Sequence, residues 1–300
     1  MTTTAQTTAQ TTAQTTAQTA AQATAQTPAQ PRTAIRSLTA DEVAAFRAAV
    51  RADLPAAGEP GTSPVHAFVL AHTLADATVR DLAAAEPEPV SVVHLGQDIQ
   101  IEQPLLPGED ITVGLDVVGA RREPKGTRVA VRARLTGEDG TPRAELLTSA
   151  LLVGAAAIEP FGQIPAPAAP APSGGAGEPA AAEHRLTPAW IRGYAHASGD
   201  LNPIHLDDRA AKDAGFPSVI AHGMSVLALA VEEIADRYAD GDVTRVLAVS
   251  GRFSAPVVPD VPLRVELAPD ADRTLVRFTC RTPSGIAVKS GWARLAGRRP

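Results

Sequence analysis

The order of the predicted secondary-structure elements repeats along this chain, and the repeat constrains the fold more than any other feature. Residues 36–50 predict a short helix and residues 65–82 a longer one, and four segments with the alternation of half-buried strands follow. After residue 184 a short helix, a long helix and strands appear again, at a period of roughly 150 residues. The sequence therefore predicts two copies of one α+β unit, in each of which an antiparallel sheet wraps a long helix.

Matching residues support this duplication. The matched segments are Ser37–Thr39 with Arg185–Thr187, Phe46 with Tyr194, and Val65–Phe68 with Ala221–Met224. Two such units are expected to join edge to edge, because joining them removes two exposed sheet edges.

Two low-complexity segments divide the chain. Residues 1–33 are dominated by a T-T-A-Q repeat that has almost nothing to bury, so a disordered tail is predicted. Residues 157–183 are rich in Pro, Ala and Gly and predict a linker. The N-terminal unit is accordingly expected at residues 34–156 and the C-terminal unit at residues 184–297.

Composition excludes several classes of protein. The net charge is −6 and no Lys/Arg run occurs, so nucleic-acid binding has no electrostatic footprint. The single cysteine, Cys280, excludes an internal disulfide framework and suits a reducing compartment. The chain has neither a secretory signal pattern nor an apolar run near the ~18 residues that span a bilayer. We therefore expect a cytoplasmic protein without nucleic-acid or membrane partners.

The residues with catalytic potential gather in Tyr194–Leu206, YAHASGDLNPIHL. Pro203 favours an extended Asn202 and ends the preceding helix, so His205 can fold back toward Asp200. A carboxylate and an imidazole that share one substrate are the usual means of activating water and returning a proton. Turns use the same residue types, so a plain turn with a solvated His205 is an equal alternative on spacing alone.

A second segment, Val219–Met224, places a His-Gly pair at the start of an apolar helical run. No Cβ covers the N–H of Gly223, and the positive end of the helix makes that N–H a suitable oxyanion donor. A helix cap with a structural His222 is the alternative. Further along the helix, Glu232 and Glu233 are predicted to form a solvated face.

Other catalytic signatures are missing from the sequence. There is no GxGxxG after a strand, no Walker A motif and no HExxH. The seven histidines show no metal-ligand spacing with carboxylates. We therefore expect neither a metal nor a cofactor.

The combination of Ser198-Gly199-Asp200-Leu201-Asn202-Pro203-Ile204-His205 with Ile220–Met224 resembles the MaoC-like (R)-specific enoyl-CoA hydratases, also called hydratase 2. It is also similar to the related (3R)-hydroxyacyl-ACP dehydratases. The motif covers residues 194–224, and the repeated layout extends the resemblance to about 36–296. The resemblance implies a double hot-dog fold of the α+β class, in which two sheets, each around a long helix, join as an intrachain pseudo-dimer.

The resemblance also implies roles for individual residues. Asp200 and His205 would be the catalytic pair, and the Gly223 N–H would bind the thioester oxygen. The supporting residues would be Tyr194, Ser198, Asn202 and His222. The pair would add water at C3 of a trans-2-enoyl thioester and give an (R)-3-hydroxyacyl thioester, with dehydration as the reverse. The substrate would be an acyl-CoA or an acyl-ACP. The carrier, chain length, direction, pathway and homodimer formation stay open.

The first unit departs from this pattern. It has Ala52-Asp53-Leu54-Pro55 in place of the catalytic loop, and Ala67 replaces the glycine that follows the matched histidine. We expect this unit to be inactive and hypothesise that it shapes the acyl pocket. Two functions of other classes are a thioesterase, which the Asn-Pro-x-His element argues against, and a non-catalytic acyl-binding protein, which the intact Asp200 and His205 argue against.

Overall fold

The structure is a computed structural model that describes residues 31–55, 61–166 and 169–297. The T-T-A-Q repeat at residues 1–30 lies outside the described residues, so its disorder stays a prediction.

Among the described residues, the N-terminal unit contains two helices and six strands. Its elements are β1 (Arg32–Arg36), α1 (Ala40–Val50), α2 (Val65–Ala84), β2 (Ser91–Ile101), β3 (Ile111–Glu123), β4 (Gly126–Thr136), β5 (Pro142–Val153) and β6 (Phe161–Gly162). The cap of α1 shows why the helix begins where it does. The hydroxyl of Thr39 accepts from the Glu42 N–H, and the Glu42 carboxylate accepts from the Thr39 N–H, which is a capping box.

The C-terminal unit repeats this order and adds short helices between the long ones. Its elements are β7 (Ala180–Arg185), α3 (Pro188–Ser198), η1 (Pro203–His205), α4 (Asp208–Asp213), α5 (Gly223–Tyr238), η2 (Val243–Arg245), β8 (Val246–Phe253), β9 (Pro262–Pro269), β10 (Leu275–Thr282) and β11 (Gly285–Leu295). The sequence predicted the four longer helices and most strands to within a few residues. It did not predict β1, β6, β7 and β8 as strands, nor the short helices η1, α4 and η2.

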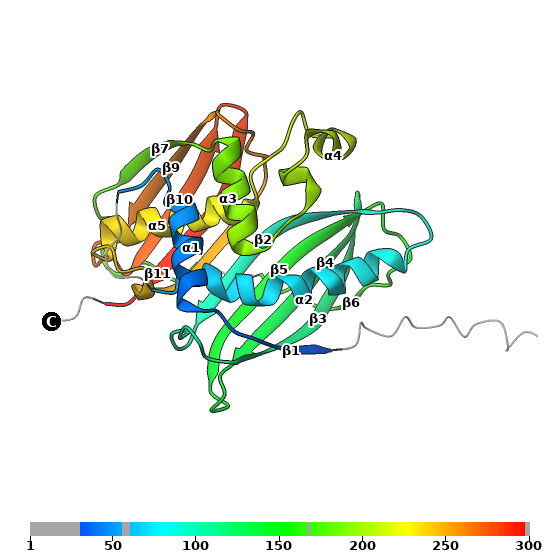
Figure 1. Ribbon diagram of the computed structural model, residues 1–300, viewed down its shortest axis with the longest axis horizontal. Helices are drawn as coiled ribbons and strands as arrows, with labels where there is room; N and C mark the ends of the chain where they lie inside the picture. Colours follow the sequence, from blue (N-terminus) through cyan, green and yellow to red (C-terminus); the bar gives the residue numbers. More distant parts are fainter. Residues whose placement is uncertain (1–30, 56–60, 167–168, 298–300) are drawn as a thin grey trace, which may run out of the picture.

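All strands belong to one antiparallel sheet. The order is β1-β3-β4-β5-β2-β8-β11-β10-β9-β7, and β6 pairs with β3. The second half of this order is the first half reversed, with β7, β9, β10, β11 and β8 in the places of β1, β3, β4, β5 and β2. The halves meet where Gly96–Gln100 pairs with Ala248–Arg252 (Figure 1). The predicted edge-to-edge joining of two units into a pseudo-dimer is therefore present.

Each half of the sheet carries one long helix on its face. Figure 1 shows α2 across the N-terminal strands and α5 across the C-terminal ones, with α1 and α3 packed together between them. The Trp190 indole N–H on α3 donates to the Val50 carbonyl at the end of α1, 3.2 Å away. Among the described residues, no helix is long and apolar enough to cross a bilayer.

The prediction of a solvated face at Glu232 and Glu233 was wrong. Both are buried, with 2% and 4% of their surface exposed. Glu232 accepts from the guanidinium groups of Arg47 and Arg51, while Glu233 pairs with Arg237. α1 and β7 cover this side of α5 and pair with both carboxylates. The sequence of α5 alone cannot show these partners, because they come from distant parts of the chain.

Two edge strands occupy the margins of the predicted tail and linker. Arg32 and Thr33 pair with Gly114 and Leu115 of β3, so the last two residues of the predicted tail are strand. Residues 180–183 of the predicted linker pair with β9 as part of β7. The N–H and C=O groups of an open sheet edge favour such added strands, even where the local composition is low in hydrophobic residues. The division into units stays a prediction.

Candidate active site

The loop after α3 is held by its own polar residues. Gly199 ends the helix with φ +74°, a left-handed conformation that glycine adopts without strain. The Asp200 carboxylate then accepts from the Asn202 N–H, and the Asn202 side chain accepts from the Ile204 N–H, both at 3.3 Å. The interpretation of these residues as turn formers and their interpretation as a candidate site are therefore compatible, because the turn positions the Asp200 carboxylate and the His205 imidazole.

His205 is not a solvated loop residue, since only 8% of its surface is exposed. Its Nδ1 lies 2.8 Å from the Ile220 carbonyl, which can only accept, so Nδ1 carries the proton and Nε2 keeps a free lone pair. Burial lowers the pKa of His205 from its usual 6.5, against the opposing effects of the Ile220 bond and of Asp200. The ring is therefore neutral near pH 7 and can accept a proton.

His222 links the two segments of the site. Its Nε2 donates to the Asp200 carbonyl at 3.0 Å and lies 4.0 Å from the Asp200 carboxylate. Its ring stacks on that of His205, with 3.6 Å between the centroids. Burial, with the adjacent His205, lowers the pKa of His222 to about 4, although Asp200 acts in the opposite direction. A neutral His222 thus holds the Asp200 backbone beside His205.

Asp200, His205 and His222 each offer a donor atom, and these atoms lie within 4.8 Å of one another. Such a trio has the composition of a metal site. The Nδ1 of His205 and the Nε2 of His222 each donate a proton to a backbone carbonyl, however, so neither of these two atoms offers a lone pair. The geometry suits proton transfer better than coordination, and the absence of a metal stays a prediction.

Gly223 is the first residue of α5 and lies directly after His222. The first N–H groups of a helix have no partner within the helix and point out of its positive end. A Cβ on Gly223 would lie 2.8 Å from the Phe253 ring, so no larger side chain fits there. The close packing of that ring is a second reason for glycine, and the sequence did not indicate it.

Tyr194 and Ser198 lie behind the loop. The Ser198 hydroxyl accepts from the Asp200 N–H at 3.2 Å, and so fixes the start of the turn. Tyr194 is fully buried, with its ring centroid 5.0 Å from that of His222. Burial, with the adjacent Asp200, raises the pKa of its hydroxyl well above the usual value, while Ser198 acts in the opposite direction. The structure thus brings all seven predicted site residues into one region.

Residues 175–278 match the family model of the MaoC-like domain. The matched residues make up about a third of the chain and lie almost entirely in the C-terminal unit, which is therefore similar to the MaoC-like domain. A 3-hydroxyacyl-thioester dehydratase of Mycobacterium tuberculosis is 48% identical over 80 residues, which make up 27% of this chain and 27% of that relative. The match to this relative therefore spans about a quarter of its length.

Solved structures extend the likeness of fold to nearly the whole chain. A MaoC-like dehydratase from Phytophthora capsici has a TM-score of 0.74 at 19% identity, covering 90% of this chain and 96% of that one. A Mycobacterium tuberculosis protein described as a double hot-dog has a TM-score of 0.61 at 15% identity, over 90% of this chain and 96% of the other. The predicted double hot-dog fold is confirmed.

Two histidines of the N-terminal unit lie against the site of the C-terminal unit, and the sequence analysis singled out neither of them. His72 on α2 lies against Gly199, because a Cβ there would be 3.7 Å from the His72 Cε1. His94 on β2 packs against Phe253, whose ring covers Gly223. His72 lies in an apolar helical segment, and His94 reaches the site only because β2 pairs with β8. The local sequence around each residue therefore did not indicate a position near the site.

The N-terminal counterpart of the site looks different. His66 matches His222 of the MaoC-like domain and also contacts its matched ring, Phe46, with 4.6 Å between centroids. Its Nδ1 accepts from the Ser63 N–H, and the residue is fully buried. Arg51, just after α1, binds Glu232 of α5. A buried ion pair thus lies where α1 ends, whereas α3 ends in the Asp200 loop.

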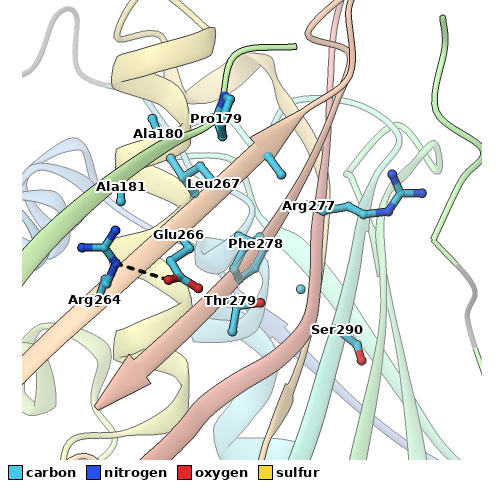
Figure 2. Close-up of a pocket in the computed structure, with 12 residues that line it drawn as sticks. Pro179, Ala180, Ala181, Arg264, Glu266, Leu267, Arg277, Phe278, Thr279 and Ser290 are labelled. Carbon is cyan, nitrogen blue, oxygen red and sulfur yellow. Dashed lines mark hydrogen bonds and ion pairs between the residues drawn. The ribbon is translucent and has the colours of Figure 1, made fainter. Parts of the chain in front are cut away.

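An open groove of about 650 Å³ lies elsewhere, on the face of the C-terminal strands turned away from α5 (Figure 2). Its lining includes Arg264, Glu266, Arg277 and Ser290. No residue predicted for the site of the MaoC-like domain lines this groove, so it is separate from the Asp200–His205 cluster.

Proposed function

We propose that this protein catalyses the reversible addition of water to trans-2-enoyl thioesters, giving (R)-3-hydroxyacyl thioesters. The proposal is carried by the observation that donor atoms of Asp200, His205 and His222 lie within 4.8 Å of one another. His222 directly precedes the helix that begins at Gly223. The name of the Mycobacterium tuberculosis relative, a 3-hydroxyacyl-thioester dehydratase, supports the same chemistry in the reverse direction.

The geometry suggests a division of work. The Asp200 carboxylate orients a water, and the free Nε2 of His205 takes its proton as the oxygen adds to C3. The C2=C3 π electrons move toward the thioester carbonyl, and the enolate oxygen accepts from the Gly223 N–H. The proton taken from water then returns to C2. All atoms of the water are retained in the product, and the reverse sequence is dehydration.

Hydration of crotonyl-CoA tests this function directly. Loss of the enoyl absorbance reports turnover, and chiral analysis of the product should give the (R)-3-hydroxyacyl thioester. Asp200→Asn and His205→Ala should each lower kcat by a factor of at least ~100, since each removes one partner of the acid–base pair. Absence of hydration by the folded wild type, or unchanged turnover in either variant, would overturn the assignment.

Asp53→Asn is the matched control, because Asp53 lies in the N-terminal loop that replaces the catalytic one and is exposed. We expect it to leave turnover unchanged. Release of free CoA, followed in the same reaction with a thiol reagent, separates hydration from thioester hydrolysis. Parallel reactions with enoyl-CoA and enoyl-ACP distinguish the two carriers.

We also keep two broader expectations as part of the proposal. The only cysteine, Cys280, is buried and free, which suits a reducing cytoplasm. Formation of a homodimer is tested by sedimentation of the full chain, where a monomer mass across the concentration range would reject it.

A further inference from the structure

A row of aromatic side chains links the two glycines of the site. At one end the Phe253 ring lies against Gly223 and makes an edge-to-face contact with His94, with 4.9 Å between the centroids. His94 in turn stacks with Phe68 at 5.9 Å, and Phe68 stacks with His72 at 5.6 Å.

The row closes on the catalytic loop. The His72 ring lies beside Gly199, the residue before Asp200. Phe68, His72, His94 and Phe253 therefore form a continuous arc from the oxyanion glycine to the carboxylate loop, and we call these four residues the ring wall. Three of the four come from the N-terminal unit, two from α2 and one from β2.

The ring wall is fixed in place. His94 Nε2 donates to the Gly96 carbonyl at 3.1 Å, and His72 Nδ1 donates to the Val69 carbonyl at 3.1 Å. Phe68 is 7% exposed and belongs to the main hydrophobic core. Rings whose centroids lie less than 6 Å apart are in contact, whereas a methylene chain needs about 4 Å of free width. An acyl chain cannot pass between neighbouring rings of the wall.

The orientation of a bound thioester follows from its two ends. The carrier arm must reach solvent, so the acyl end points into the protein. On the C-terminal side, the fully buried Tyr194 and the closely packed α5 fill the space behind the loop. The acyl carbons beyond C3 must therefore lie toward the N-terminal unit, where the ring wall stands.

We propose that the ring wall closes the acyl pocket a few carbons beyond C3 and makes this protein selective for short-chain trans-2-enoyl thioesters. The inference rests on the proposed function and specifies its substrate class. It also changes the expected role of the N-terminal unit, which shortens the pocket instead of extending it.

The test compares kcat/KM for crotonyl-CoA and trans-2-octenoyl-CoA. The wild type should favour crotonyl-CoA by at least ~10-fold, the discrimination that a hydrophobic pocket gives against excess methylenes. Phe68→Ala should raise the octenoyl-to-crotonyl ratio by at least ~10-fold, because it opens the middle of the wall. Phe68→Leu should move the ratio in the same direction by less, and it provides the comparison if the alanine variant does not fold.

Leu70→Ala is the matched control. Leu70 is a buried residue of α2, but it lies two positions on and points to another side of the helix. It should reduce stability without changing the substrate ratio. If the wild type hydrates neither substrate, the proposed function fails. If it hydrates both equally well, or if the Phe68 variants keep the wild-type ratio, the ring wall does not set chain length.

Discussion

Gly199 and Gly223 lie beside Asp200 and His222, and each position requires glycine for a different physical reason. Gly199 is needed for its backbone, since φ +74° at the end of α3 would strain any residue with a Cβ. Gly223 is needed for space, because the Phe253 ring lies 2.8 Å from where a Cβ would be. The requirement at Gly199 can be inferred from the sequence, because a helix ends there before a turn. The requirement at Gly223 depends on Phe253, in a strand thirty residues away.

Gly223→Ala should therefore act on catalysis through the position of one N–H. The added methyl displaces the Phe253 ring or the start of α5, and kcat for crotonyl-CoA should fall by about 10- to 1000-fold, as for loss of an oxyanion donor. The double variant Gly223→Ala with Phe253→Leu relieves the clash and should regain part of the loss. A single variant as active as the wild type would contradict the role of this N–H.

The acid limb of the pH profile should report His205. Its pKa is lowered by burial, so the neutral base persists to a lower pH than for an ordinary histidine. We expect the midpoint of the acid limb of kcat/KM to lie below pH 6.5. A limb that begins well above pH 6.5 would mean that a different group, or a protonated His205, is required.

At the scale of elements, α5 is the centre of the molecule. It begins at Gly223, its apolar side chains pack against the C-terminal strands, and its Glu232 binds Arg47 and Arg51 from the α1 region. This charge cluster connects the two units at the end of α1, the position that corresponds to the Asp200 loop after α3. We infer that the cluster helps to fix how the units are oriented.

Glu232→Gln should destabilise the fold strongly. The change keeps the shape of the side chain but leaves two buried guanidinium groups short of one negative charge, which should cost roughly 3 kcal/mol or more. The free energy of unfolding from urea titration measures this cost. Asp76→Asn is the control, since the exposed Asp76–Arg80 pair on α2 should contribute less than ~0.5 kcal/mol. Equal losses of unfolding free energy in the two variants would show that the buried cluster stabilises the fold no more than an exposed ion pair does.

At the scale of the whole molecule, duplication allowed the two halves to diverge. Both halves retain a buried histidine at the start of the long helix. His222 donates a hydrogen bond to the Asp200 carbonyl, whereas the Nδ1 of His66 accepts from the Ser63 N–H. One half has the Asp200 loop, and the other supplies three of the four residues of the ring wall. The pseudo-dimer can therefore be asymmetric in function, although its sheet order is symmetric.

The two matched histidines should also make the whole fold sensitive to mild acid. Burial lowers the pKa of His66 and of His222 to about 4, whereas the unfolded chain titrates near 6.5. Below pH 6.5 the unfolded state binds more protons, so stability should fall as the pH drops from 6.5 toward 4, by up to about 1.4 kcal/mol per pH unit for each histidine. Stability above pH 6.5 receives no further contribution from these groups. Urea midpoints measured between pH 7.5 and 4.5 test the window, and a flat profile would refute it.

The sequence by itself determined the units and the local geometry. Helix caps, strand alternation and the Asn202-Pro203 turn act over a few residues, so the paired helices, most strands and the closeness of Asp200 to His205 could be predicted. The repeat predicted that the two sheets join. The untested roles of Asp200, His205 and Gly223 rest on this local pattern and on the family likeness.

Only the tertiary structure decided what faces the site from a distance. The β2–β8 joint brings His94 to Phe253, α2 brings His72 to Gly199, and α1 turns Glu232 from a solvated residue into a buried one. These contacts depend on how two sheets dock, and docking is set by the sum of many weak packing contacts across the chain. No local pattern records that sum, so the ring wall and the charge cluster could be seen only in the folded molecule.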